Sequence, residues 1–510
     1  MSPNAFNVEL QYQRIADLLR PIDIESALLF CNHVLTAWRG ENSDPVIRNL
    51  LIQLQLPSAA FLVHLAARQV LLQSLGPSNR AMGTEDFKLL INLLWEILDH
   101  DPAMKDPGWM KSDPTGSFIR YTGLQQRLID IPLQTYGLAV ALFTEEMPRG
   151  SDETLDVPAR LQEVLRMSPM VFMRAGHVAG STRLVNSGRV KLPGTISSNF
   201  VEKCPTEFGA DVVENWSRFL ELVSSTQSQF RSKSHDLTSA CLDIRYDLYR
   251  FNLLRRFPLI DVGRNRYVIV DPNFIKARTT LGMYFDLLEA DCKDFTDSFG
   301  YRFANLVGDL TRRAYGGDRV WSESNLPQNV RTKPPSKNAD HAILGDTATV
   351  LVECKAFRPS TKLLMMGDQA DTDAIVARVA AAVRQLTEHG QAVRTGKWTP
   401  LGLVARECFG VVVTYGWIPT ANGSIFRRKV RELLLKDGCA HLPYTLLSIN
   451  EYDSFLRLVE LGKTPDAVIA NLSANDNGGF PGSFKSTLTS GAISNATYKR
   501  GKAFFVALHV

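Results

Sequence analysis

Apolar residues in the first 285 positions recur mainly at three- and four-residue spacing, the period of amphipathic helices. The segments 27–38, 59–75 and 87–98 have lengths typical of helices in globular proteins. One passage, 173–200, is rich in Gly, Ser and Val and fits either a strand pair or a long loop. Residues 1–285 are therefore predicted to form a mostly helical region that regulates activity or binds a partner.

The pattern changes after Arg266, where the β-branched run RYVIVDP predicts a strand. Helices and strands then alternate in the order α, β, β, β, α, β, α, β, α, which predicts a mixed sheet with helices on its faces. This α+β or α/β domain is expected to span 286–470. Residues 471–510 are expected to form a turn-rich segment that packs on it and ends in a strand-like run, 503–510. The predicted helices of the domain are 295–315, 371–390, 425–438 and 451–462, and its predicted strands are 319–323, the hairpin 339–355, 409–417 and 443–449.

The hairpin carries charged residues in its two most apolar strands. Glu353 and Lys355 are two apart on one strand, so they project from the same face. A loop at 345–348 sets Leu344 across from Thr349, and counting back along both strands places Asp340 opposite Glu353. Two carboxylates about 5 Å apart repel each other, so a positive group is expected between them.

A divalent cation satisfies this requirement better than Lys355 alone, which neutralises only half of the pair. Mg²⁺ prefers oxygen ligands, keeps most of its waters and is typically held by one or two carboxylates. Together with Lys355, such an ion can orient a water and stabilise the charge that develops on a phosphate during in-line attack.

Asp340 followed thirteen residues later by the E-x-K element "ECK" resembles the PD-(D/E)xK phosphodiesterases, the restriction-endonuclease-like nucleases. The resemblance covers about residues 295–450 and includes the family's αβββαβ core order. It implies that Asp340 and Glu353 bind Mg²⁺, or Mn²⁺ in its place, with help from the carbonyl of Cys354. It also implies that Lys355 positions or activates the attacking water.

The chain departs from the family pattern at two positions. Ala339 replaces the Pro that often precedes the first Asp, which removes no ligand. Ala304 stands where the first helix often carries a Glu, which puts a second metal site in doubt. An E-x-K alone carries little weight, because a chain of this size contains one or two by chance, and a surface salt bridge is the alternative.

Other polar residues near the motif are weaker candidates. Gln385 and His389, four apart on the helix after the hairpin, resemble the Q-xxx-Y element of RecB-like members, and Gln385 is assigned a supporting catalytic role. A solvated helix position fits Gln385 equally well, and a lone His on a helix is more often structural. Glu323, near the end of the preceding strand, is a candidate outer acid.

Basic residues follow the motif, and Arg358, Lys362 and Arg384 are candidate contacts to a phosphate backbone. A solvated helix face explains Arg384 equally well. Residues 291–510 hold 27 Lys and Arg against 21 Asp and Glu, a net charge of +6, whereas residues 1–290 have a net charge of −2. A polyanionic partner is therefore expected at the C-terminal part.

Composition excludes several classes of protein. The chain is 45% hydrophobic and 22% charged, which is typical of a soluble globular protein. Its seven cysteines are scattered and never form a CxxC pair, so neither a disulfide framework nor a zinc site is indicated, and a cytoplasmic location is expected. No secretion signal and no membrane-spanning stretch is apparent.

The leading functional hypothesis is a Mg²⁺-dependent nuclease, with DNA favoured as substrate and an endonuclease favoured over other modes. The layout of a large helical region and a nuclease core resembles effectors of bacterial anti-phage defence. The chain has no recognisable nucleotide site, so activation is expected through the helical region, by homo-oligomerisation or by a protein partner. The alternative hypothesis is an inactive nuclease-fold subunit that binds nucleic acid or serves as a scaffold.

Overall fold

The computed structural model describes most of the chain. The described residues are 6–40, 44–54, 61–78, 80–100, 132–147, 155–180, 185–186, 189–190, 195–197, 211–238, 247, 252–290, 292–326, 339–345, 348–358, 369–397, 407–418, 421–439, 442–462 and 493–506. Within these ranges, no helix has both the length and the apolar character needed to cross a bilayer.

The N-terminal helices form where the apolar spacing predicts them. Asn7, Asp23 and Asp44 each cap a helix by accepting a hydrogen bond from a backbone N–H of its first turn. The apolar faces of these N-terminal helices meet in one buried cluster, which also includes residues of a small sheet described below. The helices are α1 (Val8–Leu19), α2 (Ile24–Trp38), α3 (Pro45–Gln53), α4 (Phe61–Gln73) and α5 (Thr84–Asp99).

The middle of the chain combines helices with short strands. In the passage 173–200, the residues up to Gly180 belong to α11 (Pro169–Gly180). The strands β1 (Val185–Asn186) and β2 (Arg189–Val190) then form an antiparallel pair, so the predicted strand pair is confirmed in part. A second sheet has the order β3-β6-β5-β4. The helices are α9 (Pro132–Phe143), α10 (Val157–Leu165), α11 (Pro169–Gly180), α12 (Val212–Val223), α13 (Gln227–Thr238), η5 (Leu253–Arg255), α14 (Pro272–Arg278) and α15 (Met283–Ala290), and the strands are β3 (Thr195–Ser197), β4 (Ser224–Thr226), β5 (Leu259–Gly263) and β6 (Arg266–Ile269).

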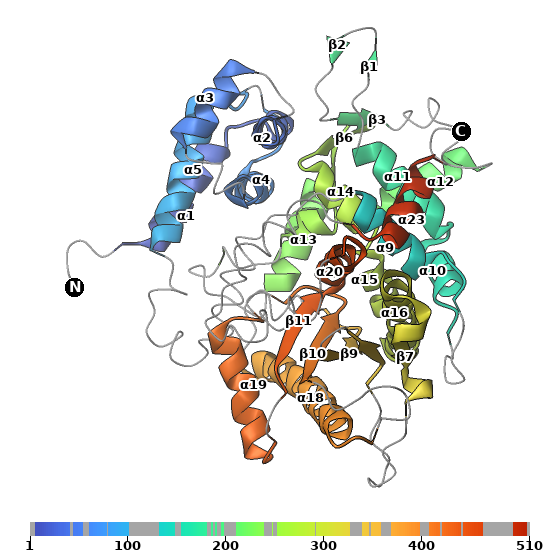
Figure 1. Cartoon of the computed structure of the whole chain (residues 1–510). Coiled ribbons are helices and arrows are strands. Elements are labelled where there is room, and N and C mark those ends of the chain that lie inside the picture. The colour runs from blue at the N-terminus through green and yellow to red at the C-terminus, as the bar shows by residue number, and fades with distance from the viewer. Residues whose placement is uncertain are drawn as a thin grey trace.

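The C-terminal part forms a mixed sheet with the strand order β11-β10-β9-β8-β7 among the described residues (Figure 1). β7, β8 and β9 are antiparallel neighbours, and β9, β10 and β11 are parallel. The predicted order of helices and strands is confirmed. The elements are α16 (Cys292–Tyr315), β7 (Val320–Ser322), β8 (His341–Leu344), β9 (Ala348–Lys355), α18 (Gln369–Arg394), β10 (Glu407–Thr414), α19 (Ser424–Lys436), β11 (Tyr444–Ser448) and α20 (Ile449–Glu460).

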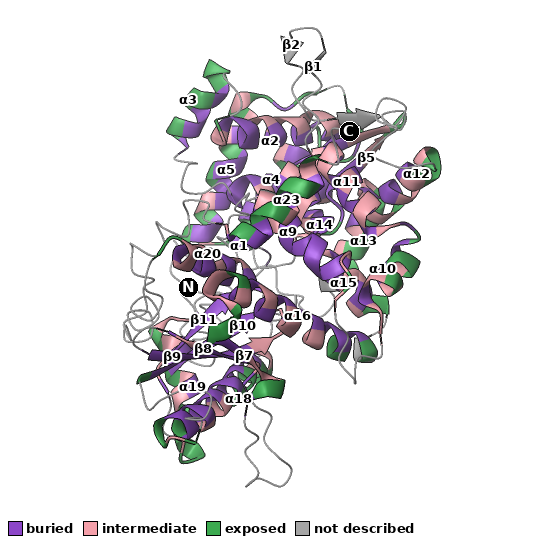
Figure 2. Cartoon of the chain, turned by 45° about the vertical axis from the view of Figure 1, so that its right-hand side comes forward, coloured by how far each residue is buried: buried purple, intermediate pink, exposed green. Residues whose placement is uncertain are grey.

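Both faces of this sheet are covered by helices, which explains why its central strands are apolar on both sides. One face packs under α18 and α19 through a cluster that includes Ala342, Leu351 and Val412. The other face packs on α16 and α20 through a cluster that includes Ile343, Val350 and Val411. Figure 2 shows these strands as almost entirely buried.

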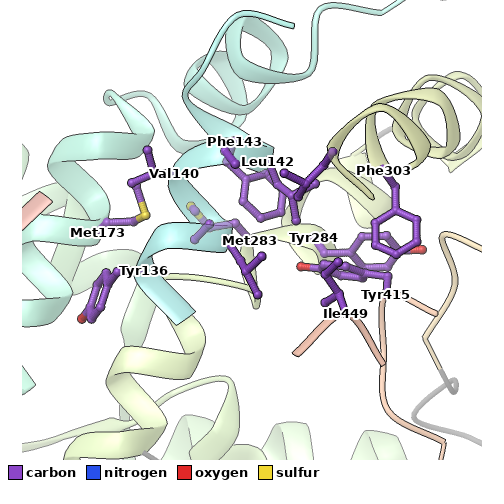
Figure 3. Packing of buried hydrophobic residues seen from close by; sticks show 14 of the residues in the cluster. Tyr136, Val140, Leu142, Phe143, Met173, Met283, Tyr284, Phe303, Tyr415 and Ile449 are labelled. Atoms are coloured by element: carbon purple, nitrogen blue, oxygen red, sulfur yellow. The ribbon is translucent and has the colours of Figure 1, made fainter. Parts of the chain in front are cut away.

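The cluster on the α16 face continues into the helical region. Figure 3 shows Phe143 of α9 and Tyr284 of α15 packed with Phe303 of α16 and with Tyr415, which follows β10. The predicted division at residue 285 falls inside α15. One hydrophobic core therefore joins parts of the chain on both sides of that position.

The strand expected at 503–510 is wrong for its first four residues, which lie in α23 (Asn495–Val506). Phe504 is buried and its ring stacks on Tyr136 of α9, with centroids 4.5 Å apart. A run of apolar residues fits a strand or a helix equally well, and the packing against α9 decides for the helix. Residues 507–510 lie outside the described part of the chain.

Close approach of α23 to α9 depends on two glycines. A Cβ on Gly501 would overlap the carbonyl oxygen of Leu133, and a Cβ on Gly137 would overlap that of Thr497. We expect Gly501→Ala to lower the free energy of unfolding by about 1–3 kcal/mol, because the two helices must separate. Urea denaturation followed by circular dichroism measures this change.

Gly300 provides the matched control for this prediction. It lies within α16, and an added Cβ there would meet no atom within 4 Å. Gly300→Ala is expected to leave stability unchanged or raise it by up to about 1 kcal/mol, since Ala favours helix. Equal destabilisation by both substitutions would contradict the proposed helix contact.

Candidate active site at the hairpin

The register of the hairpin agrees with the sequence prediction. Leu344 pairs with Thr349 and His341 pairs with Val352 in an antiparallel ladder. Asp340 directly precedes β8, so continuing the same register places it opposite Glu353 at the carboxyl end of β9. The negative charge of Asp340 contributes to the raised pKa of Glu353, which agrees with this placement.

Glu353 lies on the face covered by α18 and α19, and Asp340, which precedes β8, lies close to both Glu353 and the thiol of Cys354. Ala342 and Leu351, two residues from each, belong to the cluster beneath α18 and α19, and side chains alternate along a strand. His341 points to the opposite face, where its Nε2 lies 2.9 Å from the carbonyl oxygen of Ala304 on α16.

Two short hydrogen bonds hold the motif residues in place. The backbone N–H of Cys354 donates to Oδ2 of Asp340 at 2.6 Å. Nζ of Lys355 donates to Oε1 of Glu353, also at 2.6 Å. The second oxygen of Glu353, Oε2, is buried and has no hydrogen-bond partner. Because Glu353 is only 2% exposed, this oxygen is a buried acceptor with nothing to accept.

The surroundings of Glu353 disfavour its ionised form. Val412 of β10 lies beside it in the sheet, and α18 covers that face. Burial, reinforced by the negative charge of Asp340, raises the pKa of Glu353 to about 8, although the ion pair with Lys355 opposes this shift. The carboxylate therefore needs more positive charge than Lys355 supplies.

Lys355 is held in its charged form. Burial alone would lower the pKa of Lys355, but the adjacent carboxylates of Glu353 and Asp340 outweigh it and raise that pKa above its usual value. Lys355 therefore acts as a cationic hydrogen-bond donor in this arrangement and not as a proton acceptor.

Cys354 contributes backbone atoms to the site, while its thiol belongs to the other face. The N–H and C=O of one strand residue point to the same neighbouring strand, so the carbonyl of Cys354 is directed to the side where Asp340 lies. The side chain packs against the core on the α16 face. Burial raises the pKa of the Cys354 thiol well above its usual value, so it is not a thiolate ligand.

These groups fit a hard divalent cation. Oε2 of Glu353, the carboxylate of Asp340 and the carbonyl of Cys354 are oxygen donors at one end of the hairpin, and Mg²⁺ fills its other positions with water. The described residues contain no cluster of three or more His, Cys, Asp or Glu side chains arranged to hold a metal. Two carboxylates and one carbonyl leave several positions of the ion to water, which suits Mg²⁺.

Glu323 lies close to this pair of carboxylates. Its backbone N–H donates to the carbonyl oxygen of Asp340 at 2.9 Å. Its charge also contributes to the raised pKa of Glu353. The sequence made Glu323 a candidate outer acid, and the structure places its backbone next to Asp340.

Gln385 and His389 lie in the second half of α18. Leu386, next to Gln385, packs over Gly410, and Gly410 pairs with Leu351. Gln385 thus lies at the level of Leu351, two residues before Glu353 on β9. Its supporting catalytic role stays a prediction, and His389 is fully buried.

The predicted phosphate contacts have different positions. Arg384 pairs with Asp437 at the end of α19, and Arg358 packs at the end of β9. Lys362 lies outside the described residues. Ala304 lies on α16, where its carbonyl contacts His341, and it provides no carboxylate for a second metal.

Comparisons with known proteins add no relative to this description. A scan against protein-family models, a search of curated proteins and a search of solved structures each found no match. The functional assignment therefore depends on the site.

Proposed function

We propose that the chain is a Mg²⁺-dependent phosphodiesterase of the PD-(D/E)xK type that cuts nucleic acid. The observation that carries the proposal is the convergence of Asp340, Glu353 and Lys355 at the end of one hairpin, with Oε2 of Glu353 buried and unpartnered. An unsatisfied buried oxygen costs about 1–3 kcal/mol, so a cation bound to Oε2 would stabilise the folded chain.

Each residue has a distinct role in this proposal. When bound, Mg²⁺ supplies positive charge that stabilises the phosphate as its oxygens become more negative. Glu353, Asp340 and the carbonyl of Cys354 hold the ion, and Glu353 gives up its proton to do so. Lys355, which stays protonated, donates a hydrogen bond that orients the attacking water or a phosphate oxygen.

DNA is the favoured substrate, and endonucleolytic cleavage is the favoured mode. The net charge of +6 in residues 291–510 supports a polyanionic substrate. The combination of a large helical region with such a site also supports a role as an effector in bacterial anti-phage defence.

The proposal is tested by incubating the purified full-length chain with plasmid DNA and with RNA, with Mg²⁺, with Mn²⁺ or with EDTA. We expect metal-dependent cleavage of DNA that disappears in Lys355→Ala, because the substitution removes the cationic hydrogen-bond donor paired with Glu353. Metal-independent retardation of nucleic acid without cleavage would instead favour the inactive binding subunit.

A further inference from the structure

Arg358 is held at the carboxyl end of β9, three residues after Lys355. Its Nη1 donates to the carbonyl oxygen of Leu281 at 3.1 Å, and its guanidinium lies 4.9 Å from the ring centroid of Phe285 and 5.5 Å from that of Tyr415. Three residues of chain span at most about 11 Å. Arg358 is therefore fixed near the candidate active site by the segment that connects α14 and α15.

The segment η5 of the helical region approaches Arg358 along α15. Arg256, which follows η5, forms a bidentate ion pair with Glu289, with both N···O distances 2.6 Å. Glu289 and Phe285 are four residues apart on α15, so they lie one turn apart on the same face. Arg255 precedes Arg256 in the chain and therefore lies near this face of α15, where its charge interacts with that of Arg358.

Among the described residues, no acidic side chain pairs with Arg255. The structure shows no hydrogen bond and no ion pair for its guanidinium, although it is partly buried. Burial and the positive charge of Arg358 both lower the pKa of Arg255. Two adjacent guanidinium groups repel each other, and a buried charge without a partner is costly, so an anion between them would stabilise both.

We propose that Arg255 and Arg358 together bind a phosphate of the substrate strand, next to or one beyond the phosphate that is cut. Planar guanidinium groups match phosphate oxygens in geometry, and two of them neutralise the charge of one phosphodiester and part of its neighbour. The inference rests on the proposed function. It gives the helical region a direct contact with the substrate, through a residue more than 80 positions before the catalytic motif.

The test measures binding of fluorescein-labelled duplex and single-stranded DNA by fluorescence anisotropy, in EDTA and between 50 and 200 mM NaCl. We expect Arg255→Gln to weaken binding by roughly tenfold and to reduce the slope of log K against log[salt] by about one. Arg256→Gln is the matched control. Its charge is already paired with Glu289, so binding is expected to stay unchanged. Loss of affinity in both variants, or in neither, would overturn the proposal.

Inorganic phosphate provides a second measurement that needs no DNA. Increasing phosphate at constant ionic strength is expected to raise the melting temperature of the natural chain more than that of Arg255→Gln. Equal shifts would overturn the site, and the melting curves also show whether the variant is folded. If DNA binding depends on Arg255 but Mg²⁺ produces no cleavage, the phosphate site stands and the nuclease proposal fails. If Mg²⁺ produces cleavage and Arg255→Gln binds DNA as well as the natural chain does, the nuclease proposal stands and the phosphate site fails.

Discussion

Glu353→Gln is expected to reduce the rate of Mg²⁺-dependent DNA cleavage by on the order of 10³-fold, a loss typical of removing one essential electrostatic contact. Glutamine keeps the shape of the side chain but cannot provide an anionic oxygen for the cation. The rate is measured under single-turnover conditions with enzyme in excess over a labelled DNA. Because Glu353 is buried beside Asp340, the same substitution is not expected to unfold the chain.

Glu407→Gln is the control for this experiment. Glu407 is exposed at the first position of β10 and pairs with Ala348, at the opposite end of the sheet from Glu353. Its substitution is expected to leave cleavage unchanged. Full activity in Glu353→Gln would exclude the proposed metal site, whatever the overall fold.

The stability of the metal-free chain is expected to fall as the pH rises toward 8. The pKa of Glu353 is raised to about 8 in the folded chain, mainly by burial, from an ordinary value near 4.5. Between pH 4.5 and pH 8 the folded chain keeps a proton on Glu353 that the unfolded chain has lost. The stabilising contribution of this proton to the free energy of unfolding is therefore complete below about pH 4.5 and is lost as the pH passes 8. The slope is up to about 1.4 kcal/mol per pH unit.

Melting temperatures at pH 6 and pH 9, with EDTA or with Mg²⁺, test this prediction. Mg²⁺ competes with the proton for Glu353, so it is expected to stabilise the chain more at pH 9 than at pH 6. In Glu353→Gln this part of the pH dependence should disappear, and the metal-free variant should be more stable than the natural chain at pH 9. A variant that keeps the full pH dependence would show that other groups cause it.

The hydrophobic core shared by the helical region and the sheet bears on how the chain is organised. The carbonyl of Leu281 accepts hydrogen bonds from Tyr415 Oη at 2.7 Å and from Arg358 Nη1 at 3.1 Å. Both donors follow strands of the mixed sheet. The segment before α15 thus holds the end of the sheet where the candidate site lies, and a change in the helical region can reach the site directly through these contacts.

The sequence by itself determined the local structure of the candidate site. Strand alternation placed Glu353 and Lys355 on one face, and the short loop of the hairpin set the register that brings Asp340 opposite Glu353. The order of helices and strands after residue 290 was also predictable from the spacing of apolar residues, because these elements are long and regular.

Only the tertiary structure decided which distant residues join the site and where its charges are compensated. Glu323 reaches Asp340 through pairing of β7 with β8, and Arg256, next to Arg255, reaches Glu289 of α15 through a bidentate ion pair. The helical form of Ala503 to Val506 likewise depends on contact with α9. These features arise from packing between segments far apart in the chain, which hydrophobic period does not encode. The raised pKa of Glu353 has the same origin, because burial and neighbouring charges exist only in the folded chain.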